Sequence, residues 1–430
     1  MTEPVTRRIA PHETLRRARI PEPAAGAEPP RKPRQALILS GGGANGAYEV
    51  GILKALMSGR CRGLLAIDPD LFFGTSVGSF NASFLVSQWG EFGPASVSNL
   101  EQVWLEKLAG TAGNNGAYRF RFDPAFYLSP PSYYPKPLRP LIELFQDSAA
   151  VAWDSIQRAV DLVSATGETV REKIANLFDF SSFVSMEPWD RTIREAIDFA
   201  SIRAEDEKQL AIFATNWVSG KLRTFRNEDM TEQLGPLAIR ASSAIPGIFP
   251  QVYVGAEPYV DGGVLMNTPL TPALEAGADI VHVIYLDPDI ASIPLGTLDS
   301  TVATSYRMQA ISWAALVNRD IDRVARINRG LEAFGRIQRG EPLGSEEMET
   351  VAKGALMVLG GMHQSTYRPI TVHRFHPREE LSSGALGMLN LDRDHLEALI
   401  YKGFTDATLH DCVKEQCVLP GKATPLQLPQ

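Results

Sequence analysis

Residues 35–46 read QALILSGGGANG, and this stretch decides the fold. Its apolar run, 35–39, is typical of a strand buried on both faces of a parallel sheet. A glycine-rich turn follows, and residues 45–57 then carry apolar side chains at helical spacing. The pattern repeats where the apolar run 71–73 leads through GTSVG, at 74–78, into helical spacing up to Trp89. Two strand–turn–helix units in succession predict an α/β domain with a mainly parallel sheet.

Composition excludes several classes of protein. The chain has 430 residues, 44% of them hydrophobic and 21% charged, with a net charge of −8. An acidic balance argues against a nucleic-acid partner. No apolar run approaches the roughly 18 residues of a membrane-spanning helix, and the N-terminus carries no signal-peptide core. Three cysteines cannot build a disulfide framework, and Cys412 and Cys417 are not spaced as C-x-x-C. We therefore expect a cytoplasmic protein without zinc or redox chemistry at that cysteine pair.

The organisation along the chain follows from changes in pattern. Residues 1–34, rich in Pro and Arg, are expected to be a disordered tail. Residues 35–290 are expected to form the catalytic domain, with a helical insertion at about 94–206 that either caps the site or belongs to the helical layer. Residues 291–430 are expected to be mainly helical. Further predicted strands lie at 210–217, 252–254, 279–286 and 370–375, and further helices at 302–337 and 395–413.

The first glycine loop has two interpretations. Gly41, Gly43 and Gly46 match the dinucleotide-binding spacing G-x-G-x-x-G, with Asp68 or Asp70 as the acidic residue expected about 20 positions on. Alternatively, the bare amides of the loop hold the oxyanion of an acyl-transfer intermediate. Both uses rely on backbone N–H groups at a helix N-terminus.

The second turn favours acyl transfer. Asp68 and Asp70 precede the strand 71–73, whereas a ribose-binding carboxylate should follow it. What ends the strand is Ser76, between Gly74 and Gly78, in a G-x-S-x-G turn between strand and helix. This context predicts a nucleophile elbow, which lifts a serine hydroxyl clear of the sheet.

A nucleophilic serine needs a base, and Asp261 is the better candidate. It follows a short predicted strand and precedes Gly262 and Gly263. Of the seven histidines, His282 lies inside a predicted buried strand, where a core role is commoner. His373 and His376 lack an acidic partner at ligand spacing, so no metal site is expected. A conventional Ser-His-Asp esterase, using His282 or a C-terminal histidine, remains the alternative within the enzymes.

Taken together, the motifs resemble those of the patatin-like phospholipases. SGGGANG at 40–46, GTSVG at 74–78 and DGG at 261–263 occur in the family's order. ASSAIPGIFP at 241–250 and NTP at 267–269 also resemble stretches that these proteins carry around their aspartate. By motif, the resemblance covers about residues 35–90 and 210–287. The family often has Lys or Arg where this chain has Asn45, so we expect no cation to assist anion binding at that position.

The resemblance implies a three-layer α/β/α fold and a lipid acyl hydrolase of the phospholipase A or lysophospholipase type, acting without a cofactor. Its implied catalytic dyad is Ser76 and Asp261, working through an acyl-enzyme intermediate. The implied oxyanion hole is formed by Gly41, Gly42 and Gly43, and Gly74 and Gly78 frame the elbow. Gly46, Gly262 and Gly263 complete the motifs. The implied partner is a phospholipid or another fatty acyl ester.

The predicted helix 302–337 and the two residues after it carry a basic face with an apolar stripe that includes Trp313 and Phe334. The arginines of this face are Arg307, Arg319, Arg323, Arg326, Arg329, Arg336 and Arg339. Such a helix either packs in the core with its arginines in water, the interpretation that we favour, or lies on anionic lipid as a peripheral membrane contact.

Overall fold

The computed structural model describes residues 32–111, 114–121, 147–148, 151, 184–286, 301–342, 344, 369–381 and 387–420. The elements described below belong to the compact unit that begins at Arg34. The predicted disordered tail lies almost wholly outside the described residues, as does much of the predicted insertion. The boundaries at 34, 290 and 291 therefore stay predictions.

An eight-stranded sheet forms the centre of the unit. Its order is β10 (Thr371–Phe375), β9 (Ile280–Ile284), β1 (Gln35–Leu39), β2 (Leu71–Thr75), β5 (Gln209–Asn216), β8 (Glu257–Asp261) and β7 (Val252–Val254), with β6 (Leu222–Arg226) also paired to β5. The five strands from β10 to β5 are parallel, and the others run antiparallel to their neighbours. A separate pair joins β3 (Arg119–Phe120) to β4 (Val184–Ser185). The prediction of a mainly parallel α/β sheet is confirmed, although β6 was not predicted because its charged sequence, LRTFR, lacks an apolar run.

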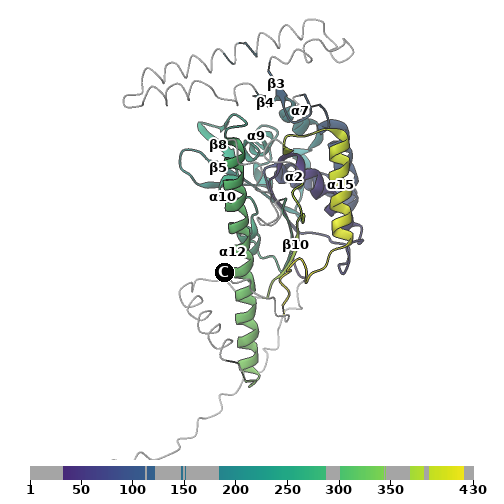
Figure 1. Cartoon of the computed structure of the whole chain (residues 1–430), viewed down its shortest axis with the longest axis vertical. Coiled ribbons are helices and arrows are strands. Elements are labelled where there is room, and N and C mark those ends of the chain that lie inside the picture. The colour runs from purple at the N-terminus through teal and green to yellow at the C-terminus, as the bar shows by residue number, and fades with distance from the viewer. Residues whose placement is uncertain are drawn as a thin grey trace, which may run out of the picture. The chain divides into compact units, whose positions relative to one another are not determined.

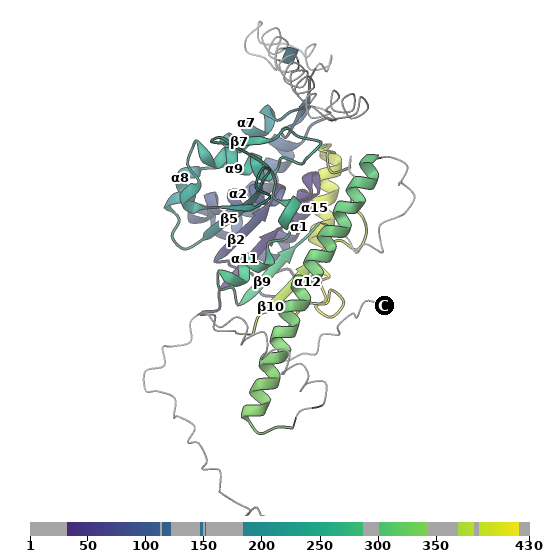
Figure 2. The ribbon, with the colours of Figure 1, turned by 90° about the vertical axis from the view of Figure 1, so that its left-hand side faces the viewer.

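Helices cover both faces of this sheet, as the alternation along β1 requires. Leu37 and Leu39 pack into the apolar cluster on one face, with α1 (Gly46–Met57), α2 (Val77–Phe92) and α15 (Arg393–Thr408). Ala36 and Ile38 pack into the cluster on the other face, with α11 (Leu270–Glu275) and α12 (Thr301–Gln338). Figure 1 shows α12 and α15 on opposite sides of β10, and Figure 2 shows α12 crossing the sheet. The three-layer α/β/α arrangement is therefore confirmed.

The remaining described helices are short. They are η1 (Gly43–Asn45), η2 (Gly93–Ala95), α3 (Ser96–Gln102), η3 (Val103–Leu108), α7 (Glu187–Ala196), α8 (Phe199–Ala204), η6 (Asn227–Asp229), α9 (Leu234–Ser242) and α10 (Gly263–Met266). Four of them, α3, η3, α7 and α8, lie in the predicted insertion at 94–206. Their buried side chains join the same cluster as α1 and α2, so the described part of the insertion belongs to the helical layer.

The middle of α12 packs its apolar stripe into the core. Val317, Ile321 and Val324 are buried in the cluster that includes strands β9 and β10. On the opposite side, Arg319 and Arg323 are exposed to solvent. Throughout the described ranges, every helix is too short or too polar to cross a bilayer.

The last helix is shorter than predicted. The pattern suggested 395–413, but α15 ends at Thr408. Leu409 and Val413, which seemed to extend its apolar face, are 60% and 81% exposed. The chain instead turns back to the edge strand β10, where Val418 pairs with Val372.

Helices α1 and α15 make close backbone contact through two glycines. A Cβ atom on Gly51 would meet the carbonyl oxygen of Ile400, and one on Gly403 would meet that of Tyr48. The hydroxyl of Tyr48 also donates to Asp406 Oδ2 at 2.9 Å. The interface therefore has no room for a side chain at either glycine.

We expect Gly403→Ala to lower the free energy of unfolding by about 1–3 kcal/mol, because the added methyl group would force the helices apart. A matched control is Gly330→Ala in α12, where no atom lies within 4 Å of the added Cβ. That change should stabilise the protein by about 0.5–1 kcal/mol, since alanine favours a helix. Chemical denaturation of both variants measures the difference, and equal effects would contradict the packing described here.

Candidate active site

Strand β5 aligns the two predicted catalytic residues. Thr75, the last residue of β2, lies opposite Phe213, and Asp261, the last residue of β8, lies opposite the next residue, Ala214. Strand β6 occupies the other edge of β5 along 211–215, so β2 and β8 share one edge. Because β8 is antiparallel to β5 and β2 is parallel to it, their C-terminal ends point toward each other. This topology brings Ser76 next to Asp261.

The elbow at Ser76 has an uncommon backbone conformation. Ser76 has φ 54° and ψ −127°, a region that costs a non-glycine residue about 1–3 kcal/mol. Its N–H donates to Ser242 Oγ at 2.9 Å, and that hydroxyl donates to the Phe213 carbonyl at 2.6 Å. Ser242 thus ties the elbow to β5.

Gly74 and Gly78 are required by the same turn. A Cβ atom on Gly74 would meet the carbonyl oxygen of Gly78, and one on Gly78 would meet that of Leu39 in β1. The helix after Ser76 can therefore approach the sheet only if both positions lack a side chain.

Asp261 is buried at the end of β8. Its carboxylate accepts a hydrogen bond of 2.7 Å from the N–H of Gly263, and the Ser76 side chain lies close enough to interact with it. Burial raises the pKa of Asp261 to about 7, although the interactions with Ser76 and Gly263 act in the opposite direction. Trp313 of α12 covers this turn, and its Nε1 donates to the Gly263 carbonyl at 2.5 Å.

The first glycine loop lies directly against Ser76. A Cβ atom on Gly41 would come 2.7 Å from the Cβ of Ser76. The N–H of Gly41, however, donates to Asn267 Oδ1 at 2.9 Å, and Asn267 Nδ2 donates back to the Gly41 carbonyl at 3.3 Å. Among the described residues, no acceptor binds the N–H of Gly42 or Gly43. Gly41 therefore anchors the loop, and its N–H is already engaged by Asn267.

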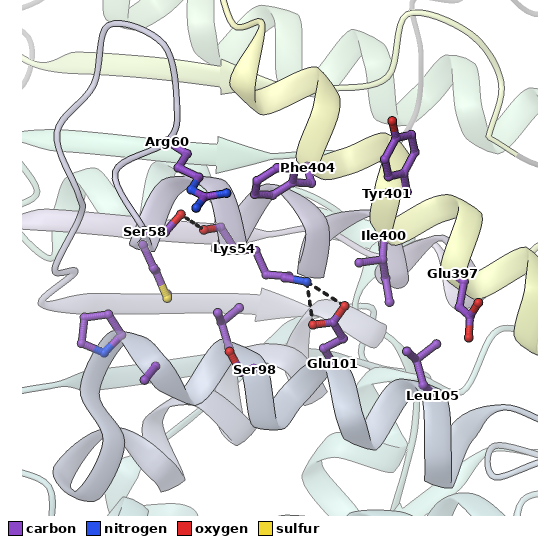
Figure 3. Close-up of a pocket in the computed structure, with 14 residues that line it drawn as sticks. Lys54, Ser58, Arg60, Ser98, Glu101, Leu105, Glu397, Ile400, Tyr401 and Phe404 are labelled. Carbon is purple, nitrogen blue, oxygen red and sulfur yellow. Dashed lines mark hydrogen bonds and ion pairs between the residues drawn. The ribbon is translucent and has the colours of Figure 1, made fainter.

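A small apolar cavity of about 60 Å³ opens beside Ser76. Part of its wall comes from the predicted insertion, namely Trp104, Leu108, Ala117, Tyr118, Met186 and Trp189. The opposite wall includes Phe249 and, from the segment before α15, Met388 and Leu389. A second, larger cavity of about 730 Å³ lies between α1, α3 and α15, where Lys54 pairs with Glu101 at 2.6 Å (Figure 3). None of the predicted site residues lines that larger cavity.

His282 lies too far from Ser76 to act as its base. It is opposite Leu37, which in turn is opposite Phe72, four residues before Ser76. The separation is about 13 Å along the strands and about 10 Å across them. The His282 ring instead stacks on His373, with ring centroids 5.3 Å apart.

The carboxylates needed for dinucleotide binding lie at the opposite end of the sheet. Asp70 Oδ2 accepts from the N–H of Gln35 at 2.8 Å, at the amino end of β1. Asp68 pairs with Lys208 at 2.6 Å. Neither carboxylate can meet a ribose at the glycine loop, which follows the carboxyl end of β1.

Three supporting residues of the site were not predicted from the sequence. Ser242 and Asn267 lie in stretches that contributed to the family resemblance, but no role followed from them. Trp313 comes from α12, where helical spacing alone made it part of an apolar stripe. Their contacts depend on tertiary structure, because each partner is distant along the chain.

Comparisons with known proteins identify the family of this chain. The sequence model described as patatin-like phospholipase matches residues 37–274, more than half of the chain. No curated protein matches. Among solved structures, the crystal structure of VipD from Legionella pneumophila is similar, with 13% identity and a TM-score of 0.35 over 88% of this chain and 66% of that one. The family match, which contains Ser76, Asp261 and the glycine loop, shows that this chain belongs to the patatin-like phospholipases, a family of hydrolases.

Proposed function

We propose that the protein hydrolyses fatty acyl esters with Ser76 as nucleophile and Asp261 as general base. The observation that carries this proposal is the place of Asp261: its buried carboxylate lies beside the Ser76 side chain, where the ends of β8 and β2 meet. An ordinary aspartate is a weak base, with a pKa of about 3.9. Burial raises the pKa of Asp261 to about 7, so this carboxylate can accept a serine proton near neutral pH.

In the first step, Ser76 Oγ attacks the ester carbonyl while Asp261 takes its proton. The carbonyl oxygen becomes an oxyanion, which the N–H groups of Gly42 and Gly43 would stabilise. Collapse of the intermediate breaks the ester bond, and Asp261 returns the proton to the departing alcohol. Water then attacks the acyl-enzyme with Asp261 again as base, which releases a fatty acid and restores the Ser76 hydroxyl.

Support for the substrate class comes from the family and from the apolar side chains beside Ser76. Trp104, Leu108 and Trp189 offer an acyl chain an apolar wall next to the nucleophile. Burying each methylene group there would contribute about 0.8 kcal/mol to binding. A phospholipid or lysophospholipid acyl ester is therefore the proposed substrate.

A histidine is not needed in this mechanism. The partners of the Asp261 carboxylate are Ser76 and Gly263, and His282 is remote from both. The Ser-Asp pair is thus favoured over a Ser-His-Asp triad.

We expect Ser76→Ala and Asp261→Asn each to lower kcat for a fatty acyl ester by about a thousandfold or more. Each change removes either the nucleophile or the base, and neither works without the other. The exposed positions Ser98→Ala and Asp206→Asn serve as matched controls and should retain full activity. A fluorophosphonate should label the wild-type protein at Ser76. Labelling at another serine, or an active Ser76→Ala variant, would contradict the assignment.

The pH profile of kcat/KM tests the base. Asp261 must be deprotonated to act, so activity should be present above its pKa and lost as the pH falls through about 7. An unperturbed carboxylate would place the inflection near 4. His376→Gln and His395→Gln should leave the inflection in place; a shift in either variant would attribute it to a histidine.

Membrane contact through the arginine face of α12 is a second, separate proposal. Arg319, Arg323 and Arg326 are exposed on that helix. If they bind anionic lipid, sedimentation with anionic vesicles should weaken as salt rises, and Arg319→Glu with Arg323→Glu should abolish it. Equal binding to neutral vesicles would exclude this electrostatic contact.

A further inference from the structure

Four potential metal ligands meet where the chain after α15 returns to the edge of the sheet. His373 belongs to β10, and His410, Cys412 and Cys417 follow α15. One nitrogen or sulfur atom from each lies within 4.8 Å of the other three. The backbone pairing of Val418 with Val372, through two hydrogen bonds of 2.9 Å, holds the two segments together at this point.

Three of the six separations between these atoms fit a tetrahedron, and the other three are shorter than 4.8 Å. Cys412 Sγ lies 3.6 Å from His373 Nδ1 and 3.4 Å from His410 Nε2. Cys417 Sγ lies 3.5 Å from the same His410 nitrogen. In a tetrahedral site with Zn–S of about 2.3 Å and Zn–N of about 2.0–2.1 Å, nitrogen and sulfur are about 3.5 Å apart. The side chains therefore stand at ligand spacing around a common centre.

The surroundings of the cluster suit a closed, structural site. His373, His410 and Cys417 are buried, and Cys412 is half-buried. The backbone N–H of Arg374 donates a hydrogen bond to Cys417 Sγ at 3.3 Å. Hydrogen bonds of this kind orient the side chains that bind a metal. His282 stacks on the ring of His373 and limits its rotation.

Charge balance favours a divalent ion at this place. Two thiolates would neutralise Zn²⁺ completely, and the two imidazoles bind as neutral donors, so the complex adds no net charge to a buried region. Binding releases the two thiol protons to solvent. A donor set of two nitrogens and two sulfurs with tetrahedral spacing is typical of zinc or of an iron–sulfur centre, and zinc is the one of the two that binds as a single ion without redox chemistry.

We propose that His373, His410, Cys412 and Cys417 bind one Zn²⁺ ion that fastens the C-terminal segment to the edge strand β10. The sequence expectation of no metal site rested on two local patterns: Cys412 and Cys417 are not spaced as C-x-x-C, and His373 and His376 lack an acidic partner at ligand spacing. It did not anticipate that β10 would bring a histidine from almost forty residues away. The proposed ion is structural, because the protein supplies all four ligands, and it is independent of ester hydrolysis at Ser76.

The test is the metal content of the full chain. Protein expressed with added zinc and purified without chelators or a histidine tag should contain about one Zn²⁺ per chain by mass spectrometry of the elements. Replacement by Co²⁺ should produce the thiolate charge-transfer and strong visible absorption of a tetrahedral cobalt site. A folded protein that holds no zinc, or holds iron instead, would overturn the proposal.

Variants identify the ligands. After dialysis against a chelator, Cys412→Ala should hold at least about tenfold less zinc than the wild type, whereas Cys61→Ala, which removes the buried thiol outside the cluster, should retain it. Equal retention by the two variants would contradict the assignment. So would an intact mass showing a Cys412–Cys417 disulfide in the freshly purified wild type. Should Cys412→Ala fail to fold, the cobalt spectrum of the wild type still decides.

Discussion

The candidate active site depends on two strands that meet end to end along one edge of β5. Parallel β2 and antiparallel β8 hydrogen-bond to consecutive stretches of β5. This pairing brings their last residues, Thr75 and Asp261, together independently of the loops. A shift of one residue in either register would turn a side chain to the other face of the sheet. Backbone hydrogen bonds therefore determine the distance between Ser76 and Asp261, and side chains such as Ser242 refine it.

Features that support the proposed chemistry also oppose stability. Ser76 keeps a strained backbone conformation, and Asp261 keeps an ionisable group away from water. The rest of the unit compensates for them with strands buried on both faces and with helices that touch through glycines. Backbone strain and buried ionisable groups, which cost stability, are expected at sites that carry function.

The sequence predicted most strands because buried parallel strands are short apolar runs, as β1 and β2 demonstrate. It also predicted Ser76 and Asp261, since each lies in a glycine turn whose chemistry is local. It did not reveal that Asn267 takes the amide of Gly41, that α15 ends early, or that His373 meets Cys412. Each of these depends on contacts between distant segments, and periodicity carries no information about them. The interpretation of the insertion as a cap falls largely outside the described residues.

Much of what supports the site comes from beyond residue 274, where the family match ends. Trp313 holds the turn after Asp261, Met388 accepts from the amide of Ala44 in the glycine loop, and β10 completes the sheet. Part of what holds the candidate site therefore lies outside the stretch of chain that the family match covers. A rotation of α12 would move Trp313, whose Nε1 donates to the Gly263 carbonyl, and Gly263 in turn donates its N–H to the Asp261 carboxylate. Movement of α12, which lies outside the family match, would therefore be transmitted to the DGG motif at 261–263.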